Sequence, residues 1–95
     1  MSEARLRFPA SHPAFAGHFP GSPMVPGALL LAAALEALGL ARADLELASA
    51  KFLQPVTPDT DVEVRCIPGV AGASRLELRS AGRLVATAAL REARA

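Results

Sequence analysis

Cysteine is nearly absent from this chain of 95 residues, and the single copy, Cys66, excludes an intramolecular disulfide. The first residues, MSEARLRFP, contain no apolar run of the kind that a secretory signal requires. These two absences favour a reducing, cytoplasmic environment. The longest apolar stretch, residues 28–35, is far shorter than the roughly 20 residues that span a bilayer, so we expect no membrane span.

An excess of charge of one sign is also lacking. Ten basic and nine acidic residues are spread along the chain and give a formal charge of +1, which argues against binding to nucleic acid or to a membrane surface. Only two histidines accompany the single cysteine, without paired ligand spacing, so we expect no metal site. No redox cofactor motif is visible, and we expect no cofactor.

The length allows one domain, residues 1–95, because independent cores usually need roughly 100 residues each. The hydrophobic fraction of 52% is high for so short a chain. A domain of this size buries only about 60–65% of the surface that its unfolded chain exposes. We therefore expect the protein to associate with itself.

The first half of the chain predicts one strand and one helix. Residues 5–8 alternate charged and apolar side chains, which is typical of a short strand. Residues 27–38 are apolar on nearly every side and predict a helix that begins near Pro26 and is stopped by Gly39. A helix that is apolar all round is usually buried, so we expect the sheet to wrap it.

The second half predicts four further strands. Apolar residues alternate with polar ones from residue 45 towards residue 90, and Cys66 shares one face of its strand with Val62 and Val64, as a small buried hydrophobe would. The segments 69–72 and 80–83 supply turn residues for hairpins. The expected fold is α+β, with an antiparallel sheet of about five strands, the last four in a meander, around one central buried helix.

The segment between the first strand and the helix carries the candidate chemistry. It is rich in proline and glycine and holds His18, whose imidazole has a reference pKa of about 6.5 and can take up and return a proton at neutral pH. The N–H of Gly27 lies at the predicted start of the helix, where free N–H groups and the helix dipole favour developing negative charge. Glycine also lets a carbonyl group approach closely.

Residues 18–27, HFPGSPMVPG, resemble the signature of the 3-hydroxyacyl-acyl-carrier-protein dehydratases of bacterial fatty-acid synthesis. Residues 51–59, KFLQPVTPD, are similar to a string that follows the central helix in that family, and we interpret them as structural. The resemblance runs from about residue 13 to the last strand. It implies the hotdog fold and an acyl thioester substrate, carried on the phosphopantetheine of acyl carrier protein or on coenzyme A.

The resemblance also assigns roles to residues. His18 corresponds to the histidine that removes the α-proton of a 3-hydroxyacyl thioester, and Gly27 to the glycine whose N–H polarises the carbonyl. The side chains around them could line an acyl tunnel or could equally fill the core under the loop. The residues expected to bind substrate are Phe19, Pro23, Met24, Val25, Leu31 and Ala32.

One position departs from the family pattern. In the family, a glutamate or aspartate five residues after the glycine helps the β-hydroxyl group leave as water; here that position is Ala32. A methyl group cannot donate a proton. Glu36 lies on the same helix face but about 6 Å further along the axis, so it could reach the site only through water.

Three hypotheses follow. The first is a dehydratase in which His18 serves as both base and acid, and the second is a non-catalytic acyl-binding or partner subunit. The third is a thioesterase, because the hotdog fold also hosts thioester hydrolysis. Exposed strand edges predict a dimer in which two sheets join, as a homodimer or higher homo-oligomer, or as a heterodimer with a second hotdog chain that supplies the missing acid.

Overall fold

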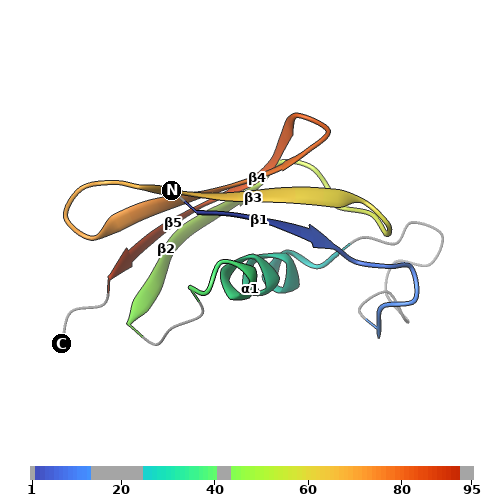
Figure 1. The fold of residues 1–95 in the computed structure, drawn as a ribbon, viewed down its shortest axis with the longest axis horizontal. Helices are drawn as coiled ribbons and strands as arrows, with labels where there is room; N and C mark the ends of the chain where they lie inside the picture. The colour runs from blue at the N-terminus through green and yellow to red at the C-terminus, as the bar shows by residue number, and fades with distance from the viewer. Residues whose placement is uncertain (1, 14–24, 41–43, 93–95) are drawn as a thin grey trace.

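The computed structural model describes residues 2–13, 25–40 and 44–92, and contains one helix against one face of a five-stranded antiparallel sheet (Figure 1). No helix within these ranges is long and apolar enough to cross a membrane. The elements in chain order are β1 (Ser2–Arg7), α1 (Gly27–Ala37), β2 (Leu45–Phe52), β3 (Asp61–Pro68), β4 (Ala73–Ser80) and β5 (Arg83–Glu92).

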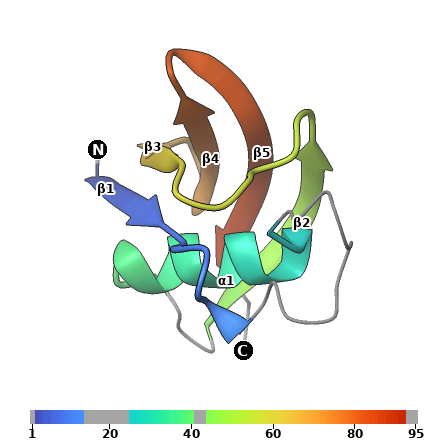
Figure 2. The ribbon, with the colours of Figure 1, turned by 90° about the vertical axis from the view of Figure 1, so that its right-hand side faces the viewer.

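The strands lie in the order β1-β3-β4-β5-β2, so β1 and β2 form the two edges of the sheet. The predicted meander is therefore wrong for β2, which pairs with β5 and not with β3. Residues 53–60 cross the end of the sheet to connect β2 with β3 (Figure 2). Alternation predicts which face a side chain occupies but carries no information about which strand lies next to it.

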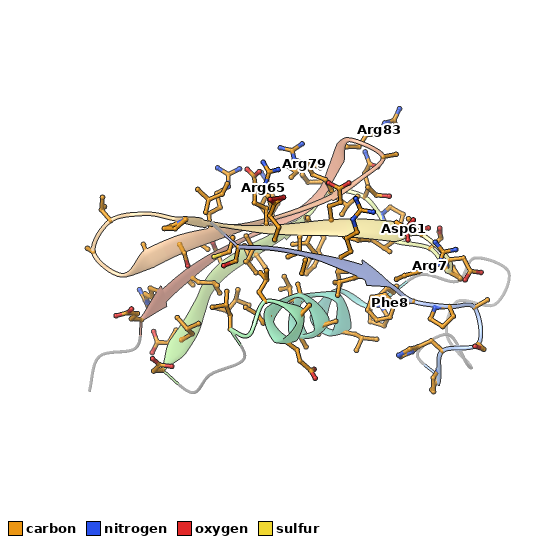
Figure 3. All side chains as sticks on the ribbon, viewed as in Figure 1. Arg7, Phe8, Asp61, Arg65, Arg79 and Arg83 are labelled. Carbon is orange, nitrogen blue, oxygen red and sulfur yellow. The ribbon has the colours of Figure 1, made fainter. Side chains whose placement is uncertain are left out.

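The core lies between the sheet and α1. The alternating residues of the central strands point towards the helix, and Leu76, Leu78 and Val62 are fully buried there. Phe8 follows β1 and closes the core at one end, on the helix side of the sheet (Figure 3). Cys66 is buried in the same layer, which confirms its interpretation as a small core residue.

The other face of the sheet is charged. Arg65, Arg79 and Arg83 lie on the side away from α1 (Figure 3). Ion pairs connect neighbouring strands on this face, including Arg7 to Asp61 at 2.9 Å. The hydrogen bond and negative charge of Asp61 raise the pKa of Arg7 above its ordinary value. Such exposed pairs contribute little to stability, but they keep this face polar and so fix which face holds the core.

The helix is covered on one side only. Leu30, Leu31 and Ala34 are buried against the sheet, whereas Ala28 and Ala32 are exposed. The sheet covers this apolar helix as expected, but one sheet can cover only one face of a helix, and the exposed residues lie on the other face. Gly39 follows the helix with φ of +72°, the left-handed conformation that glycine adopts at low cost, and this confirms the predicted stop.

Candidate functional site

The start of α1 presents backbone donors that the helix itself does not satisfy. Pro26 is the N-cap residue and has no N–H, and its carbonyl oxygen accepts the first helical hydrogen bond, from the N–H of Leu30 at 3.0 Å. No side chain among the described residues caps this end of the helix. The N–H groups of Gly27 and Ala28 belong to the first turn, where a helix offers them no acceptor. This end can therefore stabilise a carbonyl oxygen that gains negative charge.

Gly27 lies directly against the ring of Phe52, from the end of β2. A Cβ atom on residue 27 would lie 2.7 Å from Cζ of that ring, closer than carbon atoms pack. Phe52 is itself 50% exposed, so its ring is only partly held in place. The absence of a side chain at residue 27 is thus what lets the ring and the helix start meet.

A cavity of about 610 Å³ lies beside this contact. Its walls come from the first turn of α1 and from the segment that follows β2, and most of its lining side chains are apolar. The residues that line it are Val25, Gly27, Ala28, Leu30, Phe52, Leu53, Gln54, Pro55 and Val56. Its size and apolar lining suit a small acyl group, with the first N–H groups of the helix at one side.

Backbone hydrogen bonds hold both walls of the cavity. The N–H of Val25 donates to the carbonyl oxygen of Val56 at 2.7 Å, which ties the segment before α1 to the segment after β2. The N–H of Leu53 donates to Val85 on β5 at 2.9 Å. Because these bonds join segments far apart in sequence, the position of Gly27 relative to Phe52 is set by the fold as a whole.

Not all of the predicted site residues meet at this cavity. Val25 and Gly27 line it, whereas Leu31 packs into the core and does not. Ala32 and Glu36 lie on the exposed face of α1, outside the lining set. The predictions for the remaining residues concern positions outside the described ranges: His18, Phe19, Pro23 and Met24.

Sequence reasoning missed one wall of the cavity. The string 51–59 was interpreted as structural, but Phe52 to Val56 line the cavity. The available signal was the pair of adjacent large apolar residues, Phe52 and Leu53, at the end of an alternating strand, because neighbouring side chains of a strand point to opposite faces and cannot both reach one core. Both side chains are about half exposed in the structure.

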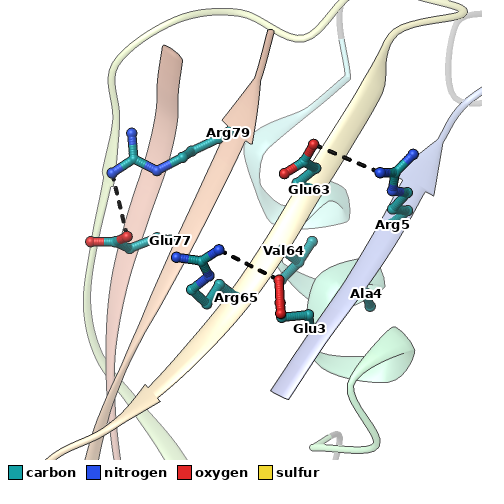
Figure 4. Close-up of a pocket in the computed structure, with 8 residues that line it drawn as sticks. All are labelled: Glu3, Ala4, Arg5, Glu63, Val64, Arg65, Glu77 and Arg79. Atoms are coloured by element: carbon teal, nitrogen blue, oxygen red, sulfur yellow. Dashed lines mark hydrogen bonds and ion pairs between the residues drawn. The ribbon is translucent and has the colours of Figure 1, made fainter. Parts of the chain in front are cut away.

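A second cavity, of about 270 Å³, lies on the charged face of the sheet (Figure 4). Ion pairs cross it from Arg65 to Glu3 at 3.5 Å and from Arg79 to Glu77 at 3.4 Å. The charged side chains of this cavity thus pair with one another while exposed to solvent, and they leave no evident binding group for a ligand. Within the described ranges, no group of three or more histidine, cysteine or acidic residues could hold a metal ion.

Solved structures with the same arrangement of strands and helix establish the fold. The dehydratase heterocomplex ApeI:P from Xenorhabdus doucetiae has a TM-score of 0.74 at 17% identity, over 98% of this chain and 88% of that one. An uncharacterised protein from Erwinia carotovora has a TM-score of 0.75 at 18% identity, over 95% of this chain and 80% of that one. The protein is a hotdog-fold protein.

The sequence comparisons narrow this class to one family. Residues 1–87 match the ApeI-like family, which is described as "ApeI dehydratase". The chain belongs to this ApeI-like dehydratase family. Among curated proteins, the 3-hydroxyacyl-acyl-carrier-protein dehydratase FabZ of Haemophilus influenzae is 39% identical over 66 residues, which cover 57% of this chain and 45% of that protein. FabZ of Rhizobium rhizogenes is 36% identical over 69 residues, 61% of this chain and 44% of that protein. The matches thus span less than half the length of these curated relatives.

Proposed function

We propose that this protein removes water from a 3-hydroxyacyl thioester, giving a 2-enoyl thioester, at the cavity beside Gly27. The observation that carries the proposal is the apolar cavity of about 610 Å³ at the start of a helix, whose first N–H groups have no acceptor within the helix. Membership of a dehydratase family supports it. The names of the relatives, which act on acyl-carrier-protein substrates, favour a thioester on acyl carrier protein over one on coenzyme A.

In the proposed reaction, the thioester carbonyl lies against the N–H of Gly27, and its oxygen gains negative charge as the α-proton leaves. His18 takes that proton as the base. The electron pair of the broken C–H bond forms the new double bond, and the β-hydroxyl leaves with a proton returned by the imidazolium of His18. One group then serves as both base and acid, which balances the reaction without a second carboxylic acid.

A second candidate function rests on Ala32. Its exposed methyl group stands at the helix position where the family carries an acid, and it can neither donate a proton nor hold a water molecule. A subunit of this kind would bind acyl groups and rely on a second hotdog chain for the acid. The name of the Xenorhabdus neighbour, a heterocomplex, is compatible with such an arrangement.

Product analysis separates the candidates. The purified protein is incubated with 3-hydroxyacyl thioesters of acyl carrier protein and of coenzyme A, and enoyl thioester and free thiol are quantified by mass spectrometry. A dehydratase forms enoyl thioester without free thiol. Free thiol as the main product would identify a thioesterase, and acyl binding without either product would favour the partner subunit.

A further inference from the structure

The cavity beside Gly27 has a buried floor and an exposed rim. The floor is formed by side chains that are at most 6% exposed, namely Val25, Leu30 and Val56. The rim is formed by residues 52–54, which are all exposed. A ligand in this cavity therefore meets apolar side chains at the floor and residues 52–54 where it leaves the protein.

Gln54 is the one polar side chain in the cavity lining that the structure describes. It lies on the rim, at the start of the segment that crosses the end of the sheet (Figure 2). Its carboxamide offers both a donor and an acceptor, and makes no hydrogen bond within the described ranges. Both polar groups of this side chain are thus available to a ligand at the mouth of the cavity.

The backbone of Gln54 is held in place on both sides. Its N–H donates to the carbonyl oxygen of Val85 on β5 at 3.3 Å. Pro55 follows, and a residue before proline is restricted to extended conformations. Only the side-chain torsions of Gln54 remain free, so a hydrogen bond from its carboxamide orders few further groups.

The chemistry of the rim matches one part of an acyl thioester. In a phosphopantetheine thioester, a short ethylene link joins the sulfur to an amide group, and a second amide follows along the arm. One carboxamide matches another, because each can donate an N–H to the oxygen of the other. A phosphate group, in contrast, is bound best by cationic side chains, and none of the described lining residues is charged.

We propose that Gln54 binds the pantetheine arm of the thioester at the mouth of the cavity, amide against amide. The inference rests on the proposed function, which places the thioester carbonyl against the N–H of Gly27 and the acyl chain on the floor. The arm does not change during the reaction, so this contact is equally strong before and after the α-proton leaves. Gln54 should therefore lower KM and leave kcat unchanged.

Truncated substrates test this contact. The 3-hydroxybutyryl thioesters of ethanethiol, N-acetylcysteamine and pantetheine carry no amide, one amide and two amides, respectively. Gln54→Leu should raise KM about five-fold for the two thioesters with an amide, as expected for loss of a neutral hydrogen bond. KM of the ethanethiol ester, and kcat of all three, should stay within about two-fold. Lys51→Leu is the matched control, a polar residue outside this lining, and should change none of these values.

Binding tests the same contact without turnover. The S-butyl thioethers of N-acetylcysteamine and pantetheine can neither lose water nor be hydrolysed, and butyl ethyl sulfide is the ligand without an amide. In NMR titrations, Gln54→Leu should raise the dissociation constants of the first two about five-fold and that of the sulfide less than about two-fold. This pattern in a protein that forms no enoyl thioester would contradict the proposed dehydration and still support the role of Gln54.

Three results would overturn the inference. Equal losses for ligands with and without an amide would show that Gln54 shapes the cavity and does not bind the arm. No loss for any ligand would show that its carboxamide stays in solvent. Thioesters of acyl carrier protein and of coenzyme A share the arm, so Gln54→Leu should raise KM by the same factor for both. A loss with one carrier alone would place Gln54 against that carrier and not against the arm.

Discussion

The two faces of α1 differ in what constrains the residues on them. The face against the sheet carries Leu30, Leu31 and Ala34, all buried, and Ala34 has no exposed surface at all. The open face carries Ala28, Ala32 and Glu36 in successive turns, all exposed. Packing fixes the residues of the first face, whereas nothing within the described chain fixes those of the second. The fold of the single chain therefore does not require alanine on the open face. We expect substitutions there to change catalytic activity more than stability.

The largest effect is expected from Ala32→Glu. A carboxylic acid at this position should raise the rate of enoyl thioester formation about 100-fold, within the range that a positioned general acid contributes. Ala37→Glu, an exposed position on the same helix outside the cavity lining, is the matched control and should give no gain. The measurement is kcat with a 3-hydroxyacyl thioester. A gain in both variants would show that added negative charge, and not position, is responsible.

Ala34→Glu tests the face of α1 that packs against the sheet. The side chain would enter a site with no exposed surface, and burying a carboxyl group without a partner costs about 3 kcal/mol or more. In a domain of this size, we expect Tm to fall by at least about 12 °C in thermal unfolding. Ala32→Glu should change Tm by only a few degrees. Equal losses in the two variants would contradict the assignment of faces.

Gly27→Ala should reduce activity about ten-fold or more with little loss of stability. The new methyl group would push the half-exposed ring of Phe52 into the cavity and hold the carbonyl away from the N–H group. The double variant Gly27→Ala with Phe52→Ala removes that collision and should recover part of the lost kcat. If kcat of the double variant is no higher than kcat of Gly27→Ala, the displaced Phe52 ring is not the cause of the lost activity.

The smallest effect is expected from Glu36→Gln. The carboxylate lies about 6 Å along the helix axis from the position of Ala32, too far for direct proton transfer. We expect kcat to fall less than about three-fold, because His18 returns the proton in the proposed reaction. A loss of about 100-fold in kcat would identify Glu36 as the acid that protonates the β-hydroxyl group, in place of His18.

Much of the fold could be predicted from local patterns. The alternation of Val62, Val64 and Cys66 identified β3 and its buried face, and Gly39 marked the end of the helix. These features depend on neighbouring residues and on elementary periodicity. The family resemblance, carried by residues 18–27 and 51–59, agrees with the dehydratase family that matches residues 1–87.

The remaining features depend on long-range geometry. The placement of β2 beside β5, the bulge after Leu47 and the contact between Phe52 and Gly27 each join segments far apart in sequence. No local period encodes them, and the wall of the cavity at Phe52 was missed for that reason. The open face of α1 was also missed, because apolar composition indicates that a residue will be covered but not by which chain.

The central claim is tested most directly by replacing each histidine separately. His12 packs its ring against Phe8, with centroids 5.3 Å apart, and so serves as a structural control for His18. On a 3-hydroxyacyl thioester, His18→Ala should reduce enoyl thioester formation at least about 100-fold, whereas His12→Ala should leave kcat within about two-fold. Full turnover by His18→Ala would contradict the proposed dehydratase mechanism.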